Sequence, residues 1–226
     1  MHGLVRPLHR VAGMLAAIVA VSVVSAVPLT RAEPASEVAF TAELLGALET
    51  TDPEAGRSDA QACVACHGEQ GLGTGATFPD LAGQVAPFLY KQLRDFRDGK
   101  RSDAVMSPFA QGLDEAALRR LAVYFAARTP RPTAEEPPRP PELARVGDGD
   151  RMIPPCASCH GYQGEGRHRL GPALAGQPQQ YLEKQLRGFR SGERASDVYG
   201  VMRSMAESLT DREIDRLAGY YAKLRR

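Results

Sequence analysis

Two stretches of the chain carry the same pattern, Cys63-Val-Ala-Cys-His-Gly and Cys156-Ala-Ser-Cys-His-Gly. They lie 93 residues apart, and other matches keep that offset. Pro79-Asp-Leu-Ala-Gly-Gln returns as Pro172-Ala-Leu-Ala-Gly-Gln, and FLYKQLRDFRDGKR at 88–101 returns as YLEKQLRGFRSGER at 181–194. An internal repeat decides the architecture before any other signal. The chain is therefore a tandem duplication of a unit of about 90 residues.

The repeat predicts two domains, a first copy at residues 33–130 and a second copy at residues 143–226. Between them lies TPRPTAEEPPRPPE (129–142), which holds six prolines and mixed charges. Proline disfavours both helix and sheet, and proline-rich segments extend. We predict that residues 131–142 form a semi-rigid linker rather than a third domain.

The secondary-structure signal in both copies is helical. Thr210 and Glu213 form a capping-box pattern, and Asp114 is a helix N-cap. Apolar residues then recur at helical spacing, which predicts a buried face in each copy: Leu118, Leu121, Ala122 and Phe125, and Ile214, Leu217, Ala218, Tyr221 and Leu224. Further helices are expected at 86–98, 179–191 and 36–49, and no segment alternates as a strand does. The expected fold is all-α.

The N-terminal segment is typical of an export signal. Arg6 and Arg10 precede a nearly unbroken apolar run at residues 11–27, and small residues follow it. This layout predicts a Sec signal peptide at residues 1–32, cleaved after Ala26 or Ala32, and a periplasmic protein. The alternative is an uncleaved anchor, because about 17 apolar residues is the short limit for a membrane span.

The charge of the chain is balanced but unevenly distributed. Loss of residues 1–32 would change the formal net charge from +1 to −2, which argues against nucleic acid as a partner. The first copy holds 9 basic and 14 acidic residues, whereas the second holds 14 basic and 10 acidic ones. The exported molecule should therefore be dipolar, which orients docking on a charged partner.

The duplicated CxxCH motif matches the attachment site of c-type haem. The two thiols, Cys63 and Cys66 in the first copy and Cys156 and Cys159 in the second, can bond to the two vinyl groups of one porphyrin. The adjacent His67 or His160 then reaches the iron. A disulfide would leave the histidines unexplained, and a zinc site expects roughly 15–20 residues between CxxC pairs. A thioredoxin-like pair needs strands, so we expect two covalently bound haem c groups.

The second axial ligand of each iron is expected to be methionine. His168 is the one histidine outside the motifs after residue 32, so it cannot complete two bis-histidine haems. Met106 and Met202 occupy equivalent places in the repeat once a three-residue insertion in the second copy is allowed for. Methionine also fills cores, and Met205 is a rival ligand in the second copy.

In the order of its motifs, each copy resembles a class I cytochrome c, and residues 55–226 resemble the dihaem cytochrome c4 family. The resemblance implies two low-spin haems in domains packed about a pseudo-twofold axis, with His67 and Met106 on one iron and His160 and Met202 on the other. It also implies that the carbonyls of Pro79 and Pro172 bond to the imidazoles. Phe78 stands where the second copy has Gly171, a departure between the copies.

The resemblance implies a one-electron carrier, not an enzyme, that works between a quinol–cytochrome c reductase and a terminal oxidase or reductase. Closed His/Met ligation would also raise the potentials, and the unlike charges of the copies suggest that the two potentials differ. One alternative is a dihaem subunit of a larger dehydrogenase complex such as a flavocytochrome. Another is a peroxidase-type haem enzyme, which needs a vacant axial position. The partners expected are redox proteins, with membrane contact only through partner complexes or an uncleaved anchor.

Overall fold

The computed structural model describes residues 2–3, 36–131, 138–167 and 171–224. The chain divides into two units, residues 1–32 and 33–226. The predicted signal peptide lies outside the described residues except for His2 and Gly3, and so does the middle of the predicted linker, residues 132–137. Within the described ranges, no helix is both long and apolar enough to cross a membrane.

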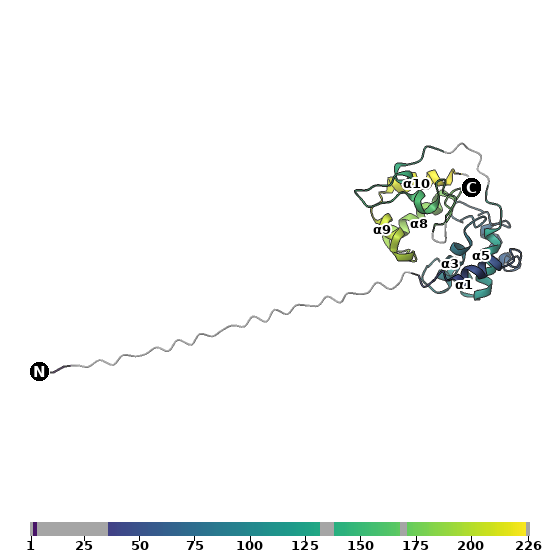
Figure 1. Cartoon of the computed structure of the whole chain (residues 1–226), viewed down its shortest axis with the longest axis horizontal. Coiled ribbons are helices and arrows are strands. Elements are labelled where there is room, and N and C mark those ends of the chain that lie inside the picture. The colour runs from purple at the N-terminus through teal and green to yellow at the C-terminus, as the bar shows by residue number, and fades with distance from the viewer. Residues whose placement is uncertain (1, 4–35, 132–137, 168–170, 225–226) are drawn as a thin grey trace. The chain divides into compact units, whose positions relative to one another are not determined.

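The first copy folds into short helices around one apolar core. Its elements are α1 (Ala42–Thr50), η1 (Asp59–Cys63), α2 (Val64–His67), α3 (Ala86–Arg97), α4 (Met106–Gln111) and α5 (Glu115–Ala126). Helix α3 packs against α5 and α4, and α1 packs against α5 (Figure 1). The predicted face of α5 is buried, with Leu118 and Leu121 at most 1% exposed.

The second copy repeats this arrangement with a separate core. Its elements are α6 (Glu142–Arg145), α7 (Cys156–His160), α8 (Gln179–Ser191), η2 (Val198–Gly200), α9 (Val201–Glu207) and α10 (Asp211–Ala222). Helix α8 packs against α10 and α9, as α3 does against α5 and α4. In the described ranges, β-structure is limited to two isolated bridges. The all-α expectation is confirmed.

Helix ends follow the predicted signals at the long helices. The Asp114 side chain accepts from the Ala117 amide, and Thr210 and Glu213 form a complete capping box. Helix α8 ends at Ser191, and the next residue, Gly192, has a φ of +80°, a left-handed conformation that favours glycine. Local sequence therefore fixes where these helices begin and end.

The structure departs from the expected elements in several places. The helix predicted at 36–49 begins only at Ala42, because Thr41 caps it and Ser36 instead bonds to Asp95. Helices α4 and α9 were not predicted. Helix α6 begins at Glu142, the last residue assigned to the linker.

The two copies meet through reciprocal contacts. Arg101 donates to Gln92 of its own copy and to Gln185 of the other, and Arg194 donates to Gln185 and across to Gln92. Because the repeat offset pairs Arg101 with Arg194 and Gln92 with Gln185, the four bonds are related by a local twofold. Within the part of the chain that the structure describes, Arg101 and Arg194 therefore bridge the repeated helices α3 and α8.

Candidate functional site

The CxxCH stretches form single helical turns that end at the histidine. Helix α7 begins at Cys156, directly after Pro155, and ends at His160. In the first copy, η1 ends at Cys63 and α2 continues to His67. One turn therefore places two thiols and an imidazole close together in each copy.

The glycine after each histidine is required by the backbone. Gly68 has a φ of +71° and Gly161 a φ of +89°, both in the region that side chains rarely adopt. A Cβ on Gly68 would lie 2.4 Å from the Leu72 carbonyl oxygen. The glycine lets the chain turn away directly after the histidine.

Each histidine is buried and hydrogen-bonded to a proline carbonyl. His67 Nδ1 lies 2.9 Å from Pro79 O, and His160 Nδ1 lies 2.8 Å from Pro172 O. Burial lowers the pKa of both imidazoles, which favours the neutral form that binds metals. Because Nδ1 donates to the carbonyl, Nε2 is left free to bind a metal ion.

An apolar cavity of about 300 Å³ lies beside α7 in the second copy. Its walls include Cys156, Cys159, His160 and Met202, four of the residues predicted from the sequence. Met205 also lines it, so the cavity alone does not choose between the two methionines. A large flat apolar group with iron at its centre needs this set of neighbours.

Part of the cavity wall is polar, and it holds both a cation, Arg194, and an acid, Asp197. Arg194 Nε and Ser196 Oγ are buried there without a hydrogen-bond partner. Burial first, and then Arg101, lower the pKa of Arg194 to about 9. Burial raises the pKa of Tyr181, but Arg101 and Arg194 outweigh it and the pKa is lowered. Unpartnered donors and a buried cation fit the propionate groups of a haem.

The first copy contributes to this cavity. Phe88, Lys91 and Gln92 of α3 line it beside residues of the second copy. Lys91 is 3% exposed, forms an ion pair with Asp95, and donates to the Ser196 carbonyl. The sequence offered no signal for this shared wall, because it arises only when the copies pack together.

In the first copy, the structure places Met106 at the start of α4. Its amide donates to Asp103 Oδ1, as does that of Val105. Met106 is half-buried. Its equivalent in the second copy, Met202, is the second residue of α9. The two methionines therefore occupy equivalent elements as well as equivalent sequence positions.

All four cysteine thiols are free. Burial raises the pKa of Cys63 to about 11 and also raises that of Cys156. A disulfide within either motif is not formed in the structure. Among the described residues, no group of three or more His, Cys, Asp or Glu side chains is placed to hold a metal ion.

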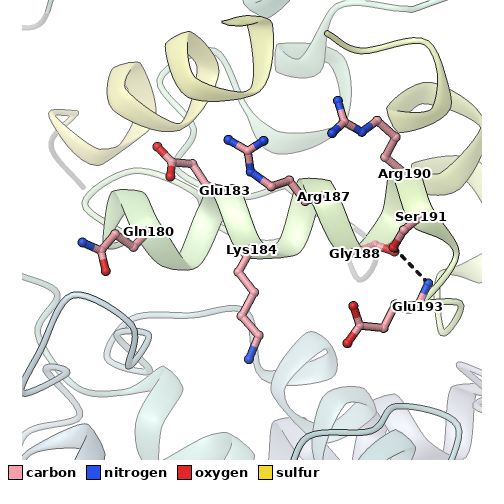
Figure 2. Close-up of a pocket in the computed structure, with 8 residues that line it drawn as sticks. All are labelled: Gln180, Glu183, Lys184, Arg187, Gly188, Arg190, Ser191 and Glu193. Atoms are coloured by element: carbon pink, nitrogen blue, oxygen red, sulfur yellow. Dashed lines mark hydrogen bonds between the residues drawn. The ribbon is translucent and has the colours of Figure 1, made fainter. Parts of the chain in front are cut away.

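A second hollow, of about 590 Å³, lies along the outside of α8. Figure 2 shows charged side chains around it, with Arg187 and Arg190 on one side of the helix and Lys184 on the other. None of the residues predicted as site residues lines it. The cavity beside α7, although smaller, is the candidate site.

Comparisons with known proteins give the same assignment for both copies. Residues 148–225 match the family model described as cytochrome c, and residues 54–125 match that described as cytochrome c oxidase, cbb3-type, subunit III. Cytochrome c4 of Thiocapsa roseopersicina is 36% identical over 175 residues, which cover 75% of this chain and 91% of that protein.

Two further relatives cover most of the chain. The thiosulfate dehydrogenase electron acceptor of Thiomonas intermedia (strain K12) is 37% identical over 188 residues, or 79% of this chain and 87% of that protein. The crystal structure of reduced cytochrome c4 from Pseudomonas stutzeri is 32% identical, with a TM-score of 0.71, and covers 77% of this chain and 100% of that one. The chain belongs to the dihaem cytochrome c4 family, a family of electron carriers with two covalently bound haem c groups.

Proposed function

We propose that Cys63 and Cys66 attach one haem and that Cys156 and Cys159 attach the other. His67 and Met106 would be the axial ligands of the first iron. In the second copy His160 and Met202 would have this role. The haem, when bound, supplies an iron centre that can accept and release one electron. The hydrogen bonds to Pro79 and Pro172 would hold the rings in orientation.

We further propose that the protein is a periplasmic one-electron carrier between a quinol–cytochrome c reductase and a terminal oxidase or reductase. The observation that carries this proposal is the cavity that holds both His160 and Met202 on its walls. Two protein ligands on one iron leave no position for a substrate, and they keep the coordination unchanged between oxidation states. Such a site suits electron transfer rather than chemistry on a bound molecule.

The second candidate is an electron-accepting partner or subunit of a dehydrogenase complex. It is favoured by the similarity to a protein named thiosulfate dehydrogenase electron acceptor. The charge asymmetry between the copies would orient docking with either kind of donor.

Rapid-mixing experiments distinguish the two donors. The oxidised protein is mixed with a reduced quinol–cytochrome c reductase, or with a thiosulfate dehydrogenase and its substrate, and haem reduction is followed by absorbance. The carrier proposal expects fast reduction by the reductase that slows as salt is added, because docking is charge-oriented. Fast reduction only by the dehydrogenase would replace it with the second candidate.

The periplasmic assignment is tested by the mass of the exported protein. We propose cleavage after Ala26 or Ala32, and each site gives a distinct intact mass with two haems attached. An exported protein with the full N-terminal sequence would instead indicate an anchor.

A further inference from the structure

Each copy ends its repeated Leu-Ala-Gly-Gln stretch with a glutamine that is buried at the boundary between the copies. Gln84 is 5% exposed and Gln177 is 3% exposed. Neither is a predicted ligand or attachment site. A buried amide needs partners for its oxygen and its nitrogen, and both glutamines find them in the opposite copy.

Gln177 bonds to both polar backbone groups of Asp80. Its Oε1 accepts from the Asp80 amide at 3.1 Å, and its Nε2 donates to the Asp80 carbonyl at 2.7 Å. Because a backbone N–H only donates and a carbonyl only accepts, these partners fix the orientation of the side-chain amide.

The same peptide group serves the histidine of the first copy. The Pro79 carbonyl that lies 2.9 Å from His67 Nδ1 belongs to the Pro79–Asp80 peptide, whose N–H donates to Gln177. One peptide thus connects a side chain of the second copy to the imidazole of the first. Hydrogen bonds in such a chain polarise and strengthen one another.

The arrangement is repeated in the opposite direction. Gln84 Oε1 accepts from the Ala173 amide at 2.8 Å, and Gln84 Nε2 donates to the Ala173 carbonyl at 2.9 Å. The Pro172–Ala173 peptide in turn presents its carbonyl to His160 at 2.8 Å. Each copy therefore reaches the histidine of the other through one glutamine and one peptide.

We propose that Gln84 and Gln177 are positioning residues that lower the reduction potential of the haem in the opposite copy. Accepting from the peptide N–H makes the proline carbonyl a stronger acceptor. A stronger bond at Nδ1 makes the imidazole more basic, which stabilises the ferric iron over the ferrous iron. Packing of the two copies is thus coupled to both potentials. The proposal rests on His67 and His160 as axial ligands.

The test replaces one glutamine at a time by leucine in the full holoprotein. A mediated redox titration is followed by NMR, so that the haem methyl signals assign each potential to its copy. For Gln177→Leu, the ferric-to-ferrous ratio of the first haem at a fixed potential should fall about threefold. For a one-electron couple this is a rise of roughly 30 mV. The second haem should move less. Gln84→Leu should give the mirror result, with the larger rise at the second haem.

A second readout follows the bond itself. In the reduced protein, the Nδ1 proton of His67 should move upfield in Gln177→Leu and stay in place in Gln84→Leu, because a weaker hydrogen bond shields the proton. The His160 proton should behave in the opposite way. A purely structural role for the glutamines would not divide the two protons between the two variants.

Lys184→Gln is the control for losing a contact between the copies that does not involve a proline peptide. It removes a contact between the copies, Lys184 Nζ to Asp103 Oδ2 at 3.0 Å, without touching either proline peptide. If both glutamine variants shift the potentials no more than this control, or shift mainly the haem of their own copy, the inference is wrong. If either variant does not fold, the other still tests the crosswise effect. Low-spin spectra in the parent protein with no crosswise shift would overturn this inference alone and leave the carrier function intact.

Discussion

Lys91 and Asp95 form a buried ion pair on α3, and replacing Lys91 by methionine should destabilise the protein strongly. The Lys91 side chain is 4% exposed and that of Asp95 is 1% exposed. The variant leaves the Asp95 carboxylate with its hydrogen bond from Ser36 Oγ at 2.7 Å but without the lysine. Removing one partner of a buried pair typically costs about 3–5 kcal/mol. We therefore expect a loss of about 3–4 kcal/mol.

The duplication supplies a matched control. Lys184 is the equivalent lysine, but its side chain is 64% exposed in its pair with Asp103, and Gly188 stands where the first copy has Asp95. An exposed pair is worth about 1 kcal/mol or less. Lys184→Met should therefore be nearly neutral, whereas Lys91→Met should lower the melting temperature by roughly 10 °C for a protein of this size.

Denaturant titrations of the holoprotein measure both variants, with a double variant to complete the cycle. Lys91→Met/Asp95→Leu removes both charges and should recover most of the loss. Burial raises the pKa of Asp95, so in Lys91→Met the native state binds a proton more readily than the unfolded state. The deficit of Lys91→Met in free energy of unfolding, relative to the parent, should then shrink as the pH falls toward the raised pKa of Asp95. A loss below about 1 kcal/mol, or a double variant as unstable as Lys91→Met, would show that the unpaired Asp95 charge does not destabilise the fold.

Three other predictions concern the second copy. Met202→Ala should open the second haem to cyanide or carbon monoxide, and Met205→Ala should not; the reverse would make Met205 the ligand. Arg194→Leu removes a buried cation from the cavity wall, and a redox titration should show a larger fall in the potential of the second haem than of the first. A change at the first haem alone would contradict the placement of Arg194 beside the second haem. The Arg151 hydrogen bond lowers the pKa of Glu213 from 4.5 to about 2, so this carboxylate stabilises the fold above pH 4.5 and its contribution is lost as the pH falls toward 2. Glu213→Gln, which keeps a capping-box residue, should show a shallower loss of stability over that range; an unchanged slope would contradict it.

The long helices could be predicted from the sequence because their signals are local. Asp114 caps α5 and Thr210 caps α10. The apolar positions that follow each cap are buried, as their spacing predicts. The duplicated CxxCH motif likewise indicated the haem sites, because two thiols and an adjacent histidine at this spacing are what covalent haem attachment requires. Repeat register then placed Met106 and Met202 on equivalent helices.

The short helices α4 and α9 were missed because their apolar spacing gives too weak a signal. Helix α4 is preceded by Asp103, whose carboxylate accepts from the backbone amides of Val105 and Met106. Helix α9 follows the inserted turn, where Tyr199 has a φ of +57° and is 92% exposed. Neither segment is long enough to show a helical period.

The boundary between the copies was beyond sequence reasoning for a different reason. Gln84 and Gln177 are visible as the ends of a repeated stretch, but their partners lie 89 and 97 residues away. Only the packing of α3 against the second copy brings Lys91 and Gln92 to the cavity wall. The sequence therefore predicted the groups that we propose hold each haem within its own copy, and it missed those that the first copy supplies to the cavity of the second.

A mediated redox titration of the purified protein, with optical spectra at each potential, shows directly whether this chain carries two reversible haem centres. We predict two reversible one-electron couples, with the higher potential at the second haem because the buried cation Arg194 lines its cavity. Both haems should stay six-coordinate and low-spin in both oxidation states, with a methionine–iron charge-transfer band when oxidised. A single haem, or a five-coordinate high-spin haem in either state, would contradict a dihaem carrier with two protein ligands on each iron.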